Sequence, residues 1–130
     1  MAAENAGGPV EALTGSRHTV FHSAAALPDE THPRADGKPT LVWFSGTWCE
    51  FCERMDPFAH DVMAAYRERA VFVEKSVDHD RNAAARYGIR GTPTFVLIDA
   101  AGNELTRFGF QPTAGLLGAT IEQALDGAES

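Results

Sequence analysis

Stretches of consecutive apolar residues divide this chain into short segments, and their lengths predict strands. A continuous apolar run at residues 40–45 is typical of a strand that is buried on both faces, and residues 71–77 and 94–100 predict two more strands of the sheet interior. A shorter run at 17–23 also predicts a strand. The segment 24–39 begins with a helical pattern, but its prolines and an Asp-Gly pair predict that it continues as an interrupted, loop-rich connection.

Apolar residues recur at helical spacing in three other segments. In 48–70 they form one face over about four turns, and Pro57 inside this segment predicts a kink. Residues 79–88 predict a short helix, and 112–126 predict a longer one with Thr113 as its N-cap. The apolar face of the first helix consists of Phe51, Met55, Phe58, Val62 and Tyr66.

The order of these elements predicts an α/β fold. A strand–helix–strand unit implies two parallel strands joined by a right-handed crossover, and the short turn at 100–103 implies an antiparallel hairpin with a half-exposed strand at 104–110. We therefore expect a mixed central sheet of four to five strands with helices on both faces. Residues 1–16 lack periodicity and predict a flexible tail, which leaves 17–130 as one domain.

Composition and charge exclude only a few classes of function. The chain has 130 residues, of which 44% are apolar, enough for one domain with its own core. Its net charge is -7 and its basic residues are scattered, so nucleic acid is not expected as a partner. We expect no membrane span, since no apolar run approaches the ~18 residues that one needs. Because no signal peptide is recognisable, the sequence as given predicts a cytoplasmic protein; the alternative is an extracytoplasmic or membrane-tethered domain whose signal or anchor has been removed.

Both cysteines of the chain lie in the segment SGTWCEFCERMDP, residues 45–57. Cys49 and Cys52 could form a redox couple, half of a metal site, or a structural disulfide. A bridge over two intervening residues closes so small a loop that it would stabilise the fold little. At the junction of a strand and a helix, however, the helix N-terminus stabilises a thiolate. This context favours a redox couple, with an exposed, attacking Cys49 and a buried, resolving Cys52.

A zinc site is the alternative from another class of function. His18 and His22 have the internal spacing of the histidine pair in a zinc finger, and the cysteine pair also has the spacing found there. The histidines come first, however, and 26 residues separate the two pairs where about 12–15 are usual. We therefore expect no metal site. His60 and His79 fit no ligand pattern and are expected to be exposed.

Two segments of the chain resemble the thioredoxin superfamily. LVWFSGTWCEFC, with Pro57 shortly after it, is similar to the active-site segment of that family, and YGIRGTPTFVLID at 87–99 is similar to its second signature. The resemblance extends over about residues 18–126. It implies a thioredoxin-like fold and a thiol–disulfide oxidoreductase with no cofactor other than the Cys49–Cys52 disulfide. Its partners would be a protein disulfide and an unidentified upstream electron donor, and we expect a monomer.

The resemblance also implies roles for single residues. Cys49 would be the nucleophile and Cys52 the resolving cysteine. Pro93 would be a cis-proline against the sulfurs, which would leave the backbone of Thr92 free to pair with an extended substrate segment. Trp48 would lie beside the cysteines and shape the substrate surface, although plain packing is an equal alternative. The alternative function is a thioredoxin-fold binding or chaperone module with an idle cysteine pair.

One departure from the family pattern concerns proton transfer. Many thioredoxins carry a buried Asp on the strand before the cysteines, where this chain has Trp43. We hypothesise that Glu74, on the next predicted strand, replaces this Asp as the proton relay to Cys52, because a carboxylate inside an interior strand needs a partner. The alternative is that Glu74 lies at a strand end and pairs with a basic residue such as Lys75.

The dipeptide between the cysteines is the second departure. Glu50, followed by Glu53 and Asp56, opposes formation of the Cys49 thiolate. This arrangement predicts a reducing couple rather than a dedicated oxidant. Phe51 adds an apolar side chain, and we expect it to contribute with Glu50 to the surface that binds a protein substrate.

Overall fold

The structure is a computed structural model and describes residues 25–129. Its strands are β2 (Thr40–Ser45), β3 (Val71–Ser76), β4 (Thr94–Ile98) and β5 (Glu104–Phe108), and its helices are α2 (Glu50–Ala64), α3 (Arg81–Arg86) and α4 (Ala114–Glu129). The four strands form one sheet in the order β3-β2-β4-β5. β2 and β3 are parallel, whereas β4 is antiparallel to both β2 and β5. The predicted mixed sheet and C-terminal hairpin are therefore confirmed.

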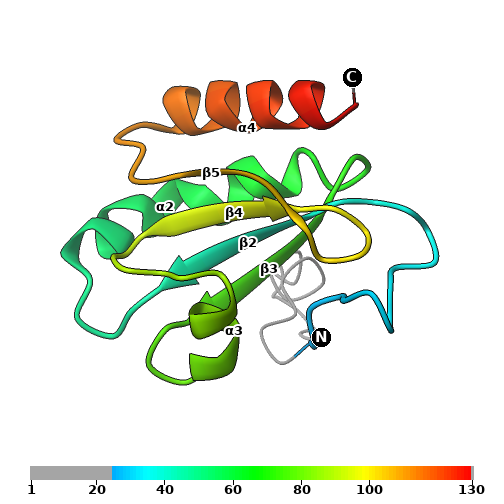
Figure 1. Cartoon of the computed structure of the whole chain (residues 1–130). Coiled ribbons are helices and arrows are strands. Elements are labelled where there is room, and N and C mark those ends of the chain that lie inside the picture. The colour runs from blue at the N-terminus through cyan, green and yellow to red at the C-terminus, as the bar shows by residue number, and fades with distance from the viewer. Residues whose placement is uncertain (1–24, 130) are drawn as a thin grey trace, which may run out of the picture.

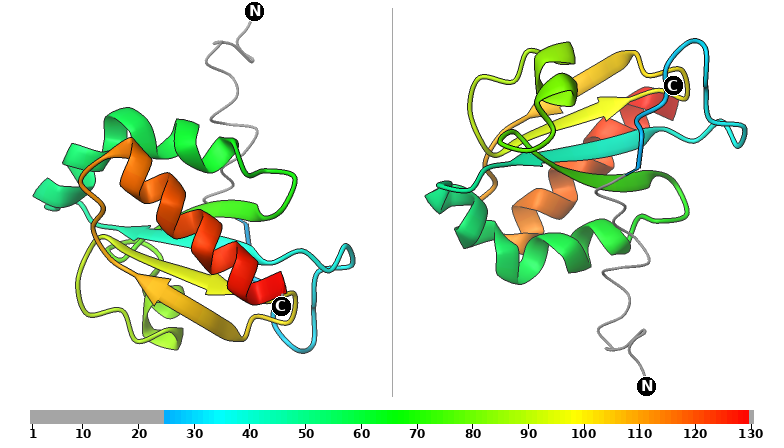
Figure 2. Two further views of the ribbon diagram at one scale, coloured as in Figure 1. Left: turned by 90° about the horizontal axis from the view of Figure 1, so that it is seen from above. Right: turned by 90° about the horizontal axis from the view of Figure 1, so that it is seen from below.

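Helices cover both faces of the sheet, as the sequence predicted. Figures 1 and 2 show α2 and α4 side by side over one face, with α3 on the other. Alternate residues of a strand point to opposite faces. In β2, Trp43 belongs to the core under α2 and α4, and Phe44 belongs to the core under α3. Both side chains are at most 1% exposed, which explains why this interior strand is apolar at successive positions.

Three aromatic rings connect the strands on the face covered by α2 and α4. In the sheet register Trp43 pairs with Phe95, and Phe95 pairs with Phe108. Both pairs of rings are stacked, with centroids 5.6 Å and 4.8 Å apart. Cross-strand aromatic pairs stabilise a sheet by roughly 0.2–1 kcal/mol each relative to alanine pairs. The stacked rings therefore hold β2, which leads into the cysteines, firmly against β4.

Helix α2 is shorter than predicted, and its most buried line of residues is offset from the predicted apolar face. It ends at Ala64, and residues 65–69 form turns instead of continuing the helix to 70. The C-terminal half of the predicted face, which consists of Phe58, Val62 and Tyr66, is only half-buried. It lies toward α4, where Tyr66 Oη donates a hydrogen bond to the Gly118 carbonyl at 3.1 Å. The fully buried residues of α2 are Cys52, Met55, Ala59 and Met63.

The segment 25–39 contains no helix, so the helical start predicted for this part of the chain was wrong. Its prolines remove backbone donors that a helix would need, and contacts with distant elements hold it instead. Arg86 Nη2, for example, donates to the Pro28 carbonyl at 2.8 Å. The strand predicted at 17–23 and the tail predicted at 1–16 lie outside the described residues.

The N-cap predicted for the last helix is confirmed. Thr113 Oγ1 accepts a hydrogen bond from Leu116 N–H at 3.1 Å, which satisfies one of the backbone donors left free at a helix start. The buried residues of α4 lie along one stripe that packs on the sheet. They are Leu117, Ile121 and Leu125.

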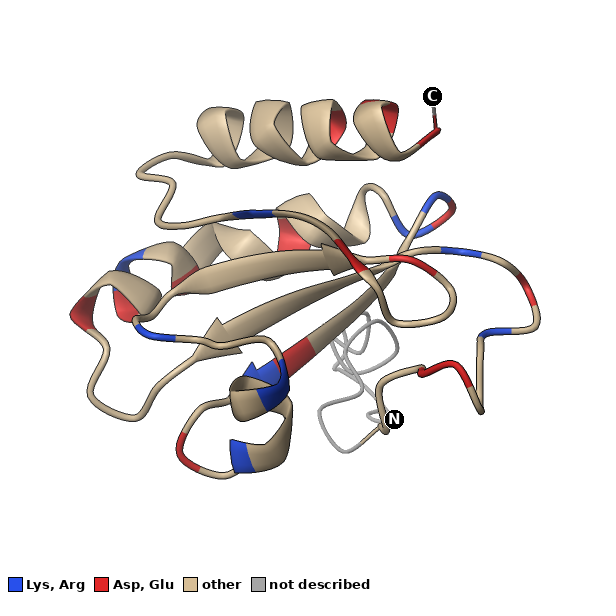
Figure 3. Cartoon of the chain, viewed as in Figure 1, with Lys and Arg blue, Asp and Glu red and all other residues tan. Residues whose placement is uncertain are grey.

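Charged residues lie mainly on loops and on the outer faces of helices. Figure 3 shows Lys and Arg interspersed with Asp and Glu, and it shows acidic residues at the start of α2. Over residues 25–129, no helix has the length and apolar character needed to cross a membrane.

Candidate active site

The two cysteines form a disulfide at the N-terminus of α2. Their Cα atoms are 5.2 Å apart. Cys49 is the N-cap residue of the helix, and its Sγ accepts a hydrogen bond from the Cys52 N–H at 3.1 Å. The predicted position of the pair, at the junction of a strand and a helix, is therefore confirmed. A sulfur at this place receives both a backbone donor and the positive end of the helix dipole, and each favours a thiolate.

The predicted contrast in exposure between the two cysteines is wrong for the disulfide form. Cys49 is 6% exposed and Cys52 is 7% exposed. A side chain that caps a helix folds back over the first turn, and here the bond to Cys52 draws the first sulfur into the same buried position. Exposure does not distinguish the two cysteines, whereas the hydrogen bond to Cys49 Sγ does.

The loop before β4 lies against the loop that leads into the cysteines. The Thr92–Pro93 peptide bond is cis, as the family resemblance implied. Pro93 is buried and Thr92 is half-buried. A Cβ atom on Gly46 would lie only 3.3 Å from Thr92 Oγ1, so the absence of a side chain at Gly46 allows the two loops to approach closely. The approach brings the cis-proline loop to the end of β2, just before the cysteines.

Asp78 also holds the loop before the cysteines, and the sequence analysis missed it. Its Oδ2 accepts the Thr47 backbone N–H at 2.7 Å. The hydrogen bond from this backbone N–H lowers the pKa of Asp78 below its usual value, and a hydrogen bond with the Thr47 side chain adds to the effect. Because Thr47 and Asp78 are 31 residues apart, no local pattern in the sequence indicates this contact.

A cavity of about 170 Å³ lies beside the disulfide, and both Glu74 and the two cysteines line it. Glu74 accepts from Ser45 Oγ at 3.4 Å. Glu74 does not pair with Lys75, because neighbouring residues of a strand point to opposite faces. Lys75 Nζ instead donates to the Ala25 carbonyl at 2.6 Å and lies 3.9 Å from Asp80 Oδ1. The predicted pairing with a basic residue is met by His60, whose Nε2 lies 3.1 Å from Glu74 Oε1. The cavity is lined by Trp43, Ser45, Gly46, Thr47, Cys49, Cys52, Glu53, Asp56 and Glu74.

His60 belongs to the same group of side chains, although the sequence analysis expected it to be exposed. Its side chain is only 11% exposed, and its Nε2 lies 3.1 Å from Glu74 Oε1. The signal was present in the sequence, because Cys52, Asp56 and His60 follow one another at four-residue spacing and so share one face of α2. The spacing alone did not reveal that this face meets β3.

Trp43, at the position where many thioredoxins have Asp, closes the inner wall of the cavity. Its ring centroid lies 5.3 Å from that of His60. The indole is 1% exposed, and its Nε1 has no hydrogen-bond partner within the described part of the chain. A donor-only indole cannot accept a proton, so Trp43 cannot replace an Asp in proton transfer.

The outer surface around the disulfide is aromatic and acidic. Trp48 is 96% exposed, so the alternative that it serves plain packing is wrong. Phe51 is 45% exposed and contacts Phe110, with ring centroids 4.8 Å apart. The Arg54 guanidinium lies 5.6 Å from each of these two ring centroids. Phe110 was missed by the sequence analysis, and the Glu50 side chain is exposed.

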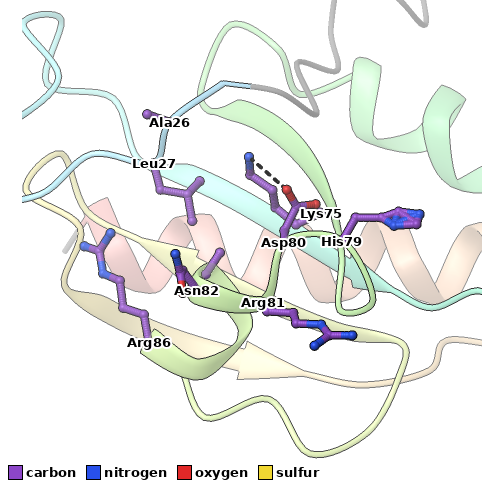
Figure 4. A pocket seen from close by; sticks show the side chains of 9 residues that line it. Ala26, Leu27, Lys75, His79, Asp80, Arg81, Asn82 and Arg86 are labelled. Carbon is purple, nitrogen blue, oxygen red and sulfur yellow. Dashed lines mark ion pairs between the residues drawn. The ribbon is translucent and has the colours of Figure 1, made fainter.

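A second cavity, of about 370 Å³, lies on the α3 face of the sheet and contains neither cysteine. Figure 4 shows that Lys75, Arg81 and Arg86 surround it and that Lys75 is paired with Asp80.

Within residues 25–129 no group of three or more His, Cys, Asp or Glu side chains could hold a metal ion. His18 and His22, the histidines of the zinc alternative, lie outside the described residues. The disulfide and its surroundings are therefore the candidate active site.

Comparisons with known proteins agree with this geometry. The thioredoxin-like domain family matches residues 29–124. The chain is 34% identical over 84 residues to the thioredoxin-like protein HCF164, chloroplastic, of Arabidopsis thaliana, covering 63% of this chain but only 32% of that protein. It is 30% identical over 99 residues to the disulfide bond reductase DsbH of Chlamydia pneumoniae, covering 65% of this chain and 60% of DsbH.

Solved structures show the same architecture. The germline-specific thioredoxin Deadhead of Drosophila melanogaster superposes with a TM-score of 0.60 at 27% identity, over 68% of this chain and 83% of that one. The chain spans about a third of the length of HCF164. The family match, the cysteine pair at the start of α2 and the cis-proline loop lead to one conclusion: the chain belongs to the thioredoxin-like family.

Proposed function

We propose that this domain is a thiol–disulfide oxidoreductase that reduces or exchanges protein disulfides, with Cys49 as nucleophile and Cys52 as resolving cysteine. The observation that carries the proposal is the position of Cys49 as N-cap of α2, where the Cys52 N–H donates to its sulfur at 3.1 Å. The same donor that binds the sulfur in the disulfide would stabilise the Cys49 thiolate after reduction. The disulfide itself is the redox group.

The reaction would take place in two exchanges. The Cys49 thiolate attacks one sulfur of the partner's disulfide, forms a mixed disulfide, and releases the other sulfur as a thiolate. Cys52 then loses its proton and attacks Cys49 Sγ, which forms the Cys49–Cys52 disulfide and releases the partner's second thiolate. Two electrons pass from the protein dithiol to the partner, and a dithiol electron donor restores the reduced form.

The surroundings of the disulfide support a reducing role. Glu50 and Glu53 both lie in the first turn of α2, and their negative charges oppose a thiolate at Cys49. The positive side chain nearest in sequence, Arg54, lies over the Phe51 and Phe110 rings. A less stabilised thiolate belongs to a less oxidising couple. The printed name of the Chlamydia pneumoniae relative, disulfide bond reductase, is in keeping with this direction.

Glu74 is proposed as the proton relay for Cys52. Both residues line the cavity of about 170 Å³, which is large enough to hold water between them. A carboxylate in this position could take the proton of the Cys52 thiol as the sulfur attacks. Replacing Glu74 by Gln keeps the shape but removes the base, so only the second exchange should slow.

The substrate surface is proposed to combine the exposed aromatic side chains with the cis-proline loop. Trp48 and Phe51 offer apolar area beside the disulfide, and Glu50 adds a negative charge at its edge. The Thr92 backbone, before the cis bond to Pro93, would pair with an extended segment of the partner. Such a surface fits an exposed disulfide within a protein chain.

For the compartment, we propose a location outside the cytoplasm, in keeping with the extracytoplasmic alternative, and an organelle is one such location. The support is the chloroplastic name of the HCF164 relative. Fractionation of cells that express the full native protein, with alkylation of free thiols at lysis, tests the proposal. Recovery in the cytoplasmic fraction would contradict it.

Thiol counting and disulfide reduction test the proposed activity together. The purified chain should show two free thiols after treatment with dithiothreitol and should accelerate reduction of insulin by dithiothreitol. Cys49→Ser and Cys52→Ser should both lose this activity, and only Cys52→Ser should accumulate a mixed disulfide with the substrate. A reduced protein that leaves insulin reduction unchanged would instead be a binding module, and a stoichiometric metal content would indicate a zinc site.

A further inference from the structure

His60 is held in a fixed position between the core and the proposed proton relay. Its Nε2 lies 3.1 Å from Glu74 Oε1, and its ring packs against the indole of Trp43 with centroids 5.3 Å apart. The side chain is 11% exposed. An imidazole on the middle of a helix, enclosed by an indole and a carboxylate, has few orientations available. The pair of His60 and Glu74 is therefore already in place before a substrate binds.

Among residues 25–129, the groups that face this pair come from α2 and β2. On α2, Asp56 places its Oδ1 3.9 Å from His60 Nδ1. On β2, Ser45 donates its hydroxyl to Glu74 Oε2 at 3.4 Å. Of the charged side chains in the described part of the chain, only the carboxylates of Glu53, Asp56 and Glu74 line the cavity beside the pair. A proton on His60 would therefore pair directly with Glu74.

We propose that His60 is a positioning residue that controls how readily Glu74 accepts the proton of Cys52. The inference rests on the proposed function and deepens it. An ionised Glu74 can only accept a hydrogen bond, so His60 Nε2 donates to it at 3.1 Å, whereas Asp56 Oδ1, at 3.9 Å from Nδ1, is too far for a hydrogen bond. A neutral His60 leaves Glu74 able to take the proton of Cys52, whereas a protonated His60 stabilises the Glu74 carboxylate and makes it a weaker base. Attack by Cys52 should therefore be faster when His60 is neutral than when it is charged.

The atoms and electrons of this step balance without another reactant. The Cys52 thiol gives its proton to Glu74, and the electron pair left on the sulfur forms the bond to Cys49 Sγ. The bond between Cys49 Sγ and the partner's sulfur breaks, and the partner leaves as a thiolate. Glu74 then releases the proton to solvent through the cavity that it lines. His60 does not line this cavity, so it acts through Glu74.

A stopped-flow reaction with DTNB separates the two exchanges. The reduced full chain releases one thionitrobenzoate when Cys49 attacks and a second when Cys52 closes the disulfide. In the wild type the rate of the second release should rise between pH 5 and 8 about tenfold more than that of the first, a modest part of the roughly 10²–10⁴ that general base catalysis supplies. His60→Gln should lose this additional rise and leave the first release unchanged. His79→Gln is the matched control, because His79 is exposed on the α3 face (Figure 4) and should behave like the wild type.

A second measurement avoids mutation of His60, whose replacement can disturb folding. In the wild type, the ring protons of His60 observed by NMR should titrate at different pH midpoints in the oxidised and reduced proteins, because protonation of Cys52 and of the His60–Glu74 pair is linked. Glu74→Gln should abolish this difference. Equal midpoints, or an undiminished additional rise in His60→Gln, would overturn the inference. A protein that shows the linked titration but does not reduce insulin would support the inference and contradict the proposed function.

Discussion

Replacing Gly102 by alanine tests how closely the segment 25–39 packs on the sheet. Gly102 has a φ of 88°, where a side chain costs roughly 1–2 kcal/mol. Its added Cβ would lie 2.2 Å from the Pro28 carbonyl oxygen, a backbone atom that cannot rotate away. The turn would have to shift, which would weaken the hydrogen bond from Tyr87 Oη to the Gly102 carbonyl at 2.7 Å. With about 1 kcal/mol for that bond, the free energy of unfolding should fall by about 2–3 kcal/mol.

Urea denaturation followed by circular dichroism measures this loss. The midpoint should decrease with little change in the m-value, and the thermal midpoint should fall by about 10 °C for a domain of this size. Gly115→Ala is the matched control, since Gly115 lies in α4 with nothing within 4 Å of an added Cβ. Alanine there should stabilise by about 0.5 kcal/mol through helix propensity. A Gly102→Ala protein as stable as the wild type would show that the segment is not packed as described.

Three further predictions concern a helix cap and the charges around the disulfide. Thr113→Ala removes the N-cap of α4 and should lower the free energy of unfolding, measured by urea denaturation, by about 1 kcal/mol. Thr113→Ser keeps a capping hydroxyl and should retain most of this stabilisation. The pKa of Asp78 is lowered in the folded state by the Thr47 N–H, so its ionised form contributes stability above the unfolded pKa of about 3.9, and this contribution is lost as the pH falls through the folded value. Asp78→Asn should therefore flatten the acid side of a stability–pH curve, and an unchanged curve would contradict the contact. Glu50→Gln should lower the pH midpoint of Cys49 alkylation by roughly a few tenths of a unit at low salt, and by less at high salt. In the wild type, a midpoint well below about 6, against about 8.5 for a free thiol, would contradict the reducing role.

The sequence analysis succeeded where the relevant interactions are local. The spacing of Cys49 and Cys52, the helix that follows them and the Thr113 cap each depend on residues within one turn of one another. Burial of a strand on both faces can also be recognised in the sequence, because a strand such as 40–45 must then be apolar at successive positions. The cis bond at Pro93 was expected from the family resemblance and not from the residues themselves.

The expectations that failed concern contacts between distant segments. His60 was expected to be exposed, but it meets Glu74, which is 14 residues away and on another element. Cys49 was expected to be more exposed than Cys52, but the disulfide places both sulfurs in one buried position. The helical start near residue 25 depends on propensity, which contacts with the rest of the fold override.

The sequence by itself determined the order of the strands and helices, the burial of the sheet and the place of the cysteine pair, because each follows from residues close together in the chain. Tertiary structure alone decided what surrounds the disulfide. The parallel register that sets Glu74 beside Trp43, and the rotation of α2 that turns His60 toward β3, result from packing between separate elements. A proton relay depends on distances of a few ångströms between such elements, and no periodicity along the chain encodes them.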